Sequence, residues 1–338
     1  MPRRRDRGIA LLLALLILAM LVILIGQMTV TSLHNRTTAE NPLADLKNAY
    51  GTRSGYHHAI LYLAADLDKT PNVDTLHERW ASPIDLDLAG ARVSVEVKDS
   101  ERFLNLSHLV NEKGETNAAV AERLRRLVLI LHLPPETAER IIDYIDGDTR
   151  GSFESGARNE PPYSLDELLR IEDLPREALF GSAEGGEPRK GLLEFLSVWP
   201  RGTGKEEPTP AGAVNVNTAP AEILWALSDK MTPALADAIV AHRNTPLDSA
   251  AGGFQDFQSV EDVRKVQGMT DEIFQEISKS LVVRSYTFEA RARCATGHVE
   301  RGWNYVIRRL ADKKRMSLLA SQRMSDFAAA RPPEGERR

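Results

Sequence analysis

The acidic segment 143–154 holds the side chains best suited to binding a metal ion. In its sequence, DYIDGDTRGSFE, Asp146, Asp148 and Glu154 offer hard carboxylate oxygens, and two glycines allow tight turns between them. Calcium favours several oxygen ligands on a flexible loop. Arg150 opposes a cation and the spacing does not complete an EF-hand, so a solvated acidic loop is the alternative. The sequence predicts that any metal bound here is calcium, held by the three carboxylates with help from backbone carbonyls.

The other chemistry-bearing residues form no catalytic pattern. The sequence contains no G-x-S-x-G, H-E-x-x-H or phosphate-loop motif, and its eight histidines are scattered. His57 and His58 are adjacent, so on a helix their side chains point about 100° apart and cannot share a ligand. Cys294 is the only cysteine, which excludes an intrachain disulfide. We expect a protein that is not an enzyme and whose fold is held by packing.

The longest apolar run of the chain follows a basic N-terminus. Residues 9–26 are eighteen apolar residues, which span about 27 Å as a helix. The mildly polar continuation to residue 33 can cross the rest of a hydrocarbon layer about 30 Å thick. We expect a single transmembrane helix over residues 9–33. The cluster of arginines before it predicts a cytoplasmic N-terminus, with the rest of the chain on the far side of the membrane.

Gly8 ends the basic segment directly before the apolar run. A secretory signal peptide would need a small-residue cleavage site after that run, and no convincing one is present. An uncleaved anchor fits the hydropathy. The order of basic residues, glycine and apolar helix resembles that of type IV prepilins, whose peptidase cuts after the glycine. The sequence therefore predicts cleavage after Gly8, which leaves Ile9 as a methylated N-terminus, with the uncleaved anchor as the alternative.

The body of the chain begins with a second helical segment. Between residues 46 and 67 apolar residues recur at threes and fours, and Leu46, Tyr50, Ile60 and Leu63 mark one face of an amphipathic helix. Pro42 lacks the N–H that a helix interior needs, so we expect a kink or pause before this segment. The net charge of −5, with 27% charged and 42% hydrophobic residues, is typical of a globular body.

An internal repeat organises the middle of the body. Segment 133–144 aligns with 231–242, and segment 164–179 aligns with 259–274. Prolines at the expected helix starts, and serines followed by acidic residues, indicate short helices joined by tight turns. The sequence predicts two helix-hairpin-helix-like modules.

Helix-hairpin-helix units often bind nucleic-acid phosphates through backbone N–H groups at a glycine-containing hairpin. Here Pro135 and Pro233 remove those N–H groups, and only segment 266–269 resembles the binding form. The modules are not basic overall. We therefore expect no nucleic-acid partner, and keep a membrane-anchored DNA receptor for uptake as the alternative function.

Strands flank the helical modules in the sequence. Residues 92–98 (RVSVEVK) alternate strictly, and residues 281–291 and 299–309 are rich in β-branched and aromatic residues. The basic tail 311–338 is low in aromatics and is expected to be disordered. The predicted fold class is α+β. Its expected parts are a leader 1–8, a transmembrane helix 9–33, a helix with first strands 34–110, two helical modules 111–200 and 201–280, closing strands 281–310, and the tail.

The order of these features resembles one known family. The residues that carry the likeness are Arg7-Gly8-Ile9, the strand 93–97 with Asn105, the helix end 141–146, and the segments 164–169 and 214–220. Together with the closing strands they resemble the K-type minor pseudopilins of the bacterial type II secretion system, from Arg5 to about Arg309. The fifth residue after the predicted cleavage is Leu13, where most pilins carry Glu and the K type does not.

This resemblance implies a pseudopilin strand core with an inserted α-helical domain and calcium bound near the insertion. The sequence departs from the family at Arg158-Asn159, where the pattern has Glu-Asp, which removes expected ligands. The implied function is a minor pseudopilin at the tip of the pseudopilus, which nucleates or caps the filament for export of folded proteins across the outer membrane.

The same resemblance implies the binding partners and the cellular location of the protein. The implied partners are other minor pseudopilins, the major pseudopilin, the prepilin peptidase, the inner-membrane secretion platform and membrane lipid. The implied location is the inner membrane of a Gram-negative bacterium, crossed once, with the body periplasmic. We expect the helix bearing Leu46, Tyr50, Ile60 and Leu63 to contact the smaller minor pseudopilins.

Overall fold

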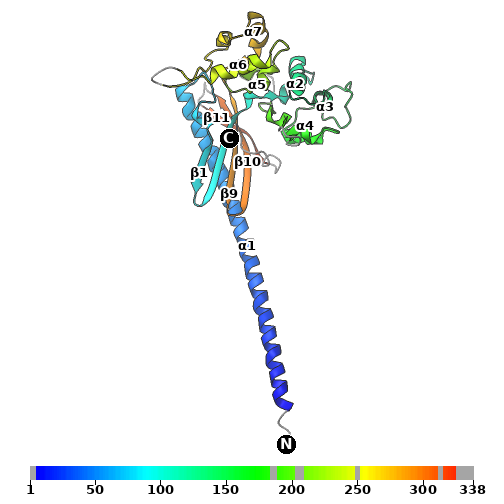
Figure 1. Ribbon diagram of the computed structural model, residues 1–338, viewed down its shortest axis with the longest axis vertical. Coiled ribbons are helices and arrows are strands. Elements are labelled where there is room, and N and C mark those ends of the chain that lie inside the picture. Colours follow the sequence, from blue (N-terminus) through cyan, green and yellow to red (C-terminus); the bar gives the residue numbers. More distant parts are fainter. Residues whose placement is uncertain (1–4, 183–188, 202–208, 248–251, 311–314, 325–338) are drawn as a thin grey trace.

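A computed structural model describes residues 5–182, 189–201, 209–247, 252–310 and 315–324. It consists of a long N-terminal helix, α1 (Arg5–Lys69), whose C-terminal part carries a head of mixed helix and sheet (Figure 1). Within the described residues, Leu11–Ser32 is the one segment long and apolar enough to cross a membrane, and none of it is buried against the protein. The observed α+β fold agrees with the predicted class.

Helix α1 continues through Pro42, so the expected kink or pause at this residue is wrong. Proline removes one helical hydrogen bond but holds φ near the helical value, so a helix with support on both sides can retain it. On the C-terminal side that support is the packing of α1 on the sheet, where Ala59 and Leu63 are buried.

The sheet has five antiparallel strands in the order β1 (Ile84–Leu88), β2 (Ala91–Asp99), β9 (Thr287–Thr296), β10 (Val299–Leu310) and β11 (Arg315–Arg323). Helix α1 lies across it at close range. A Cβ atom on Gly51 would collide with Cys294, and one on Gly55 would collide with Val95. These glycines weaken the isolated helix, yet they let its backbone approach the sheet.

Strand β11 corrects the expectation for the C-terminal tail. Residues 315–323 pair with β10 from Leu310↔Arg315 to Trp303↔Arg323, so this part of the tail is ordered. Gln322 also donates a hydrogen bond to the carbonyl of Tyr163 in the helical part of the head, at 3.1 Å. The open edge of β10 offers backbone groups for pairing, which composition alone does not reveal. Residues 325–338 lie outside the described residues.

The helical part of the head is inserted between β2 and β9. Its helices are α2 (Ala118–Ile130), α3 (Glu136–Ile145), α4 (Arg176–Phe180), α5 (Ala221–Trp225), α6 (Pro233–Arg243) and α7 (Asp271–Ile277). Short strands accompany them, namely β3 (Leu104–Asn105) with β6 (Leu196–Ser197), β7 (Val214–Asn215) with β8 (Leu281–Val282), and β4 (Gly181–Ser182) with β5 (Arg189–Lys190). The 3-10 helices Leu165–Arg170 and Val260–Lys265 precede α4 and α7.

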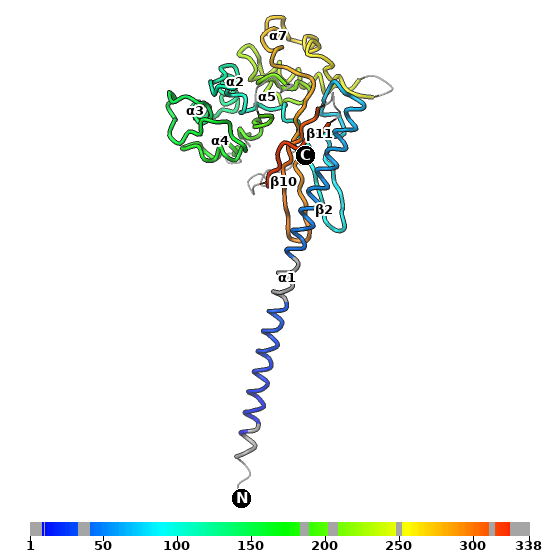
Figure 2. Tube along the Cα trace, turned by 180° about the vertical axis from the view of Figure 1, so that it is seen from behind, coloured from blue at the N-terminus to red at the C-terminus, as the bar shows by residue number. Residues whose placement is uncertain are grey.

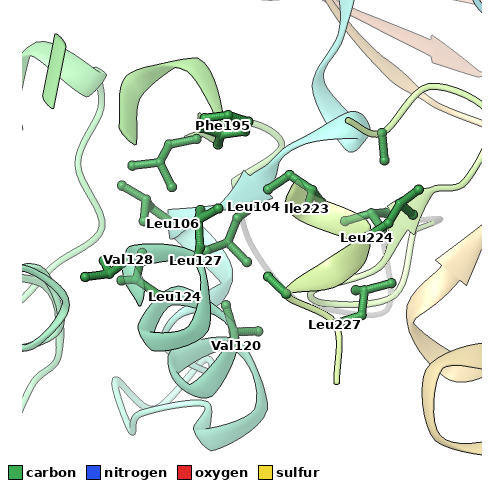
Figure 3. Close-up of a cluster of buried hydrophobic side chains, with 14 of the residues drawn as sticks. Leu104, Leu106, Val120, Leu124, Leu127, Val128, Phe195, Ile223, Leu224 and Leu227 are labelled. Atoms are coloured by element: carbon green, nitrogen blue, oxygen red, sulfur yellow. The ribbon is translucent and has the colours of Figure 1, made fainter. Parts of the chain in front are cut away.

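The predicted repeat is confirmed by the order of these elements. Each copy contains one strand of a short parallel pair, two helices, a 3-10 helix, a further helix and the second strand of the pair. The two copies do not fold separately, however, because they share one hydrophobic core. Leu106, Leu124 and Leu127 of the first copy pack in the same cluster as Ile223 and Leu224 of the second (Figure 3). Modules 111–200 and 201–280 are therefore halves of one domain.

A second core lies between α1 and the sheet. Leu63, Trp80, Val95 and Phe288 are among its buried members. Seen from behind, the sheet lies along the upper part of α1, and the helical domain sits at the end of the head far from the N-terminus (Figure 2). The head thus has two cores, joined where the chain leaves β2 and returns to β9.

Candidate functional site

The structure brings the three predicted calcium ligands together. Carboxylate oxygens of Asp146, Asp148 and Glu154 all lie within 4.8 Å of one another. Asp146 ends helix α3 and is buried, Asp148 is exposed, and Glu154 is half-buried on the loop that follows. The helix end and the turns of the loop therefore position an oxygen-rich cluster at the surface of the helical domain.

The hydrogen bonds of this cluster leave room for a cation. Asp146 Oδ2 accepts a hydrogen bond from the Thr116 hydroxyl at 2.8 Å, but its Oδ1 is buried without a hydrogen-bond partner. Glu154 Oε1 accepts the N–H of Gly151 at 2.8 Å. Burial raises the pKa of Asp146 against the Thr116 hydrogen bond, and the carboxylates around it add to the rise. An unpaired buried oxygen among like charges fits a hard divalent cation.

Asp143, which the sequence did not single out, fastens the same loop. Its Oδ2 accepts the N–H of Phe153 at 2.8 Å, and Gly151 lies so close to its carboxylate that any Cβ there would collide. Gly147 donates its N–H to the carbonyl of Gly114 at 3.0 Å. The loop is therefore anchored to helix α3 and to the turn before α2. The only signal in the sequence is the density of acids and glycines.

Arg158 and Asn159 occupy the positions where the family pattern has acids. Both donate backbone N–H groups to the carbonyl of Tyr144, at 3.0 and 3.1 Å, and so close the loop. The Arg158 guanidinium pairs with Glu167 and lies 4.9 Å from the centre of the Tyr163 ring. These two residues shape the loop and supply no carboxylate, so the carboxylates that converge here are those of Asp146, Asp148 and Glu154.

The predicted partner face of α1 is split by the structure. Leu46 and Tyr50 are 54% and 65% exposed, but Leu63 is fully buried against the sheet and Ile60 packs partly against the same core. Including Leu63 in an exposed partner face is therefore wrong, whereas the contact of Leu46, Tyr50 and the half-buried Ile60 with a partner stays a prediction. At about 100° per residue, Leu63 lies about 100° around the helix from Leu46, so one run of threes and fours covers two faces.

The large apolar residues exposed on this part of α1 are Leu43, Leu46, Tyr50 and Leu61. At about 100° per residue they fall within about 60° of one another around the helix. We call them the outer stripe. Large apolar side chains aligned on one exposed helix face indicate an interaction surface.

Gly8 and Ile9, the predicted cleavage position, lie within α1 near its start. The Ile9 side chain is exposed. Residues 1–4 lie outside the described residues. Cleavage after Gly8 and methylation of Ile9 stay predictions.

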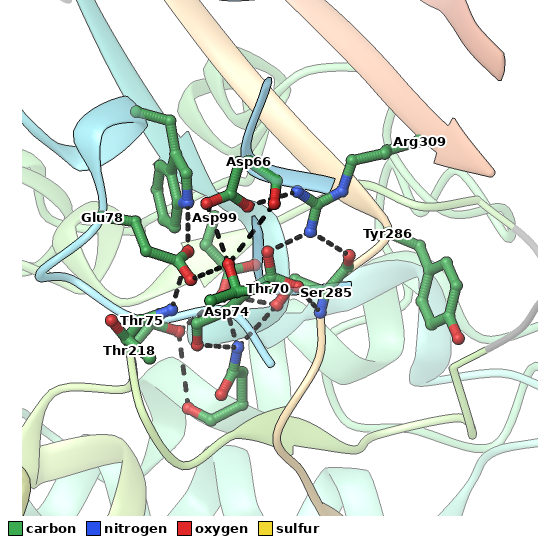
Figure 4. Close-up of polar contacts among 12 residues, drawn as sticks. Asp66, Thr70, Asp74, Thr75, Glu78, Asp99, Thr218, Ser285, Tyr286 and Arg309 are labelled. Carbon is green, nitrogen blue, oxygen red and sulfur yellow. Dashed lines mark hydrogen bonds and ion pairs between the residues drawn. The ribbon is translucent and has the colours of Figure 1, made fainter. Parts of the chain in front are cut away.

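A buried polar network, not expected from the sequence, joins the two cores of the head. Its charged members, which we call the junction network, are Asp66, Asp74, Glu78, Asp99, Glu101 and Arg309. Figure 4 labels all of them except Glu101. Asp99 Oδ2 accepts hydrogen bonds from the hydroxyls of Ser285 and Thr218, at 2.7 and 2.5 Å. Because the members come from distant parts of the chain, no local sequence motif identifies them.

Comparisons with known proteins agree with the resemblance seen in the sequence. The family model described as Type II secretion system (T2SS), protein K matches residues 214–284. Type II secretion system protein K of Pseudomonas aeruginosa is 27% identical over 280 residues, which cover 78% of this chain and 77% of that protein. Putative type II secretion system protein K of Escherichia coli K12 is 25% identical over 210 residues, covering 58% and 63%.

A solved structure has the same fold. A chain of the crystal structure of the GspK-GspI-GspJ complex from enterotoxigenic Escherichia coli superposes with a TM-score of 0.62 at 20% identity, covering 86% of this chain and 99% of that one. Sequence relatives over most of the chain, a matching family model and a shared architecture converge. Together these matches support a K-type pseudopilin of the type II secretion system.

Proposed function

We propose that this protein caps the tip of the pseudopilus and nucleates the filament that exports folded proteins across the outer membrane. The observation that carries the proposal is the position of the helical domain, at the end of the head far from the membrane helix (Figure 1). A body of about 280 residues has a radius of gyration of about 19 Å, so the head is about 50 Å across. Subunits that stack by their apolar helices with a small axial step would collide if every one carried such a head.

Leu13 supports the same position. A carboxylate buried among apolar helices is costly unless it meets a partner charge on a neighbouring subunit. A subunit with no neighbour beyond it gains nothing from such a charge, and this chain carries Leu13 where most pilins have Glu. The role is structural and requires no catalytic group.

The outer stripe supports attachment through α1. Leu43, Leu46, Tyr50 and Leu61 present an apolar helix face beside the membrane segment, which suits helix-to-helix contact with smaller minor pseudopilins. The similar fold solved as a GspK-GspI-GspJ complex supports partners of that class. In the proposed assembly the major pseudopilin follows below, and the secretion platform and membrane lipid surround the apolar helix.

The proposed topology places the basic N-terminus in the cytoplasm and the head in the periplasm, with the prepilin peptidase cutting after Gly8. Calcium is proposed as the one bound ion. Asp146, Asp148 and Glu154 would hold it, and its charge would neutralise the three carboxylates and brace the loop after α3.

Copy number tests the tip assignment. Pseudopili sheared from cells are analysed by quantitative mass spectrometry, and we expect this protein at a small fraction of the major subunit. A copy number close to that of the major subunit would refute the tip assignment.

Replacing Leu46 and Tyr50 by Ser should lower the amount of this protein in sheared pseudopili further. It should not lower the melting temperature, since both side chains are exposed. Replacing the exposed Leu129 on α2 by Ser is the matched control and should leave that amount unchanged.

Tight, salt-sensitive binding of DNA in a gel-shift assay would instead favour the DNA-uptake alternative.

A further inference from the structure

The junction network lies at the two points where the chain passes between the pilin-like core and the helical domain. The chain leaves the sheet after Asp99, the last residue of β2, and re-enters it at Thr287, the first residue of β9. Glu101, just beyond the exit, accepts the N–H groups of Tyr286 and Thr287 at 2.9 and 3.2 Å. The geometry of the two domains therefore depends on buried carboxylates at one place.

The loop after α1 is part of this joint. Asp74 donates its N–H to the carbonyl of Val283 at 2.9 Å, and its Oδ2 accepts the N–H of Ser285 at 2.8 Å. The carbonyl of Asp74 accepts a hydrogen bond from Asn215 of the helical domain at 3.2 Å. A change in the position of loop 70–78 would therefore be transmitted to both sides of the joint.

Negative charge exceeds positive charge where this loop meets the end of α1. Carboxylate oxygens of Asp66, Asp74 and Glu78 lie within 4.8 Å of one another. The one guanidinium among them belongs to Arg309, which is 1% exposed, and it donates to Asp66 Oδ2 at 2.9 Å and to Asp74. Glu78 has no cationic partner among its hydrogen bonds, which come from Thr70, Thr75 and Trp80. Three ionised carboxylates around one cation leave an excess of negative charge in a largely buried place.

The Thr70 hydroxyl indicates where a proton would sit. Its oxygen lies 2.8 Å from Glu78 Oε1 and 3.2 Å from Asp66 Oδ1. A hydroxyl has one hydrogen, so it can donate to only one of the two oxygens and must accept from the other. With a proton on Glu78 Oε1, Glu78 donates to Thr70 and Thr70 donates to Asp66, and every contact is a hydrogen bond. Without that proton, one of the two carboxylate oxygens faces a lone pair of the Thr70 oxygen, and that contact is repulsive.

We propose that the Glu78–Thr70–Asp66 chain is a proton-operated latch, which holds the helical domain against the pilin-like core when protonated and loosens the joint when the proton leaves. A cavity of about 550 Å³ lined by Thr70, His77 and Glu78, among others, lets the latch exchange protons with solvent. The head would therefore hold the helical domain more rigidly in acid than at neutral pH.

The surrounding charges agree with this assignment. The titratable groups around Glu78 are Asp66 and Lys69 from α1, Asp74 and His77 from the loop, and Asp256 from the helical domain. Arg309 of β10 pairs with Asp66 and Asp74, and the charge of Asp99 acts on Asp74. His77 turns to Asp256 at 2.9 Å and does not neutralise Glu78. Burial raises the pKa of Glu78 to about 7, and the charges of Asp66 and Asp74 add to the rise. Burial likewise raises the pKa of Asp74 to about 6, in spite of Arg309.

The sign of the effect follows from linkage. A carboxyl group whose pKa is raised in the closed state stabilises that state below its ordinary pKa, and this stabilisation is lost as the pH rises through about 7. With a closed-state pKa of about 7 and an ordinary pKa in the open state, the equilibrium constant for opening rises about tenfold between pH 6 and pH 8.

Hydrogen–deuterium exchange of the full-length protein in detergent micelles tests the latch. Peptides covering residues 70–78 and 283–287 are followed at pH 6 and pH 8, with rates corrected by an unstructured reference peptide, and peptides from β9 and β10 serve as internal controls. We expect the opening constant of the two joint segments to rise about tenfold while the control peptides stay unchanged. Equal corrected protection at both pH values in the wild-type protein overturns the proposal without any variant.

Two variants and a control sharpen the test. Glu78→Gln keeps the donor toward Thr70 and removes the titration, so we expect slow exchange of loop 70–78 at both pH values. Thr70→Val removes the bridge, so we expect fast exchange at both. Glu136→Gln, at the exposed start of α3, should keep the wild-type pH response. A full wild-type pH response in Glu78→Gln would assign the titration elsewhere and refute the latch.

Discussion

Replacing Arg309 by Met is the sharpest test of how the two domains of the head are joined. The Arg309 guanidinium is 1% exposed and pairs with Asp66 and Asp74, which are also buried. Met preserves much of the side-chain volume but leaves two carboxylates without their cation. Removing one partner of a buried ion pair typically destabilises a protein by about 3–5 kcal/mol.

The size of this effect can be compared with a surface pair. For domains of roughly 150–250 residues each kcal/mol lowers the melting temperature by about 2–4 °C, so Arg309→Met should lower it by about 6–20 °C. Arg301→Met is the matched control, because Arg301 pairs with Asp45 at 2.7 Å and both side chains are partly exposed. Exposed pairs contribute about 0–1 kcal/mol, so the control should lose at most about 4 °C.

The pH dependence supplies a second check. Arg309 lowers the pKa values of Asp66 and Asp74 against the larger effect of burial, so its removal should raise both further. At pH 5 the two aspartates can then take up protons and lose their unpaired charge, whereas at pH 8 they cannot. The loss of melting temperature should therefore be larger at pH 8 than at pH 5.

Thermal unfolding of the full-length protein in micelles, followed by intrinsic fluorescence, measures all of these values. Trp80 reports on the core between α1 and the sheet, where it is fully buried. If Arg309→Met costs no more than the control, or the same at both pH values, the buried pairs do not carry the stability assigned to them.

Three further predictions concern packing, calcium and processing. Gly55→Ala should lower the melting temperature by the equivalent of about 1–3 kcal/mol, because the new Cβ collides with Val95, whereas Gly26→Ala, with nothing within 4 Å, should leave it unchanged. Calcium should raise the melting temperature relative to a chelator, and Asp146→Ala should abolish the difference, because only the native loop assembles the ligands. The gain should shrink as the pH falls, since burial raises the pKa of Asp146 and protons compete with the ion; equal midpoints with calcium and chelator would show a merely acidic loop. Intact-mass measurement should find a membrane-extracted protein that begins at a methylated Ile9, and a protein that still begins at Met1 would exclude prepilin processing.

Local patterns were sufficient for much of the head. The alignment of 164–179 with 259–274 predicted matching short helices, and in the structure each segment contains a 3-10 helix followed by an α-helix. Both 3-10 helices begin as the cap residues predict. Ser164 accepts the N–H of Asp166, and Ser259 forms a capping box with Asp262. The helix starts near Pro135 and Pro233 were also expected. Caps, prolines and periodicity act within a few residues, which is why they can be recognised in one sequence.

Contacts between distant segments were beyond such patterns. Periodicity placed Leu46 and Leu63 on one helix face, but the sheet buries Leu63 and leaves Leu46 exposed. Composition predicted a disordered tail, but the free edge of β10 orders residues 315–323 as β11. In both cases the outcome depends on a surface that exists only after the chain has folded.

What the sequence determined by itself is the membrane helix, the repeated helical segments, the strands on either side of them and the acidic loop after α3. Each of these follows from hydropathy, capping or charge within a short window. What only the tertiary structure decided is that the two repeats share one core, and that Asp66 of α1 and Asp74 of the loop after it meet Arg309 of β10 at the joint. Their interaction energies depend on burial and on distances across more than 200 residues of chain, since Asp66 and Arg309 are 243 residues apart, and no local pattern encodes those quantities.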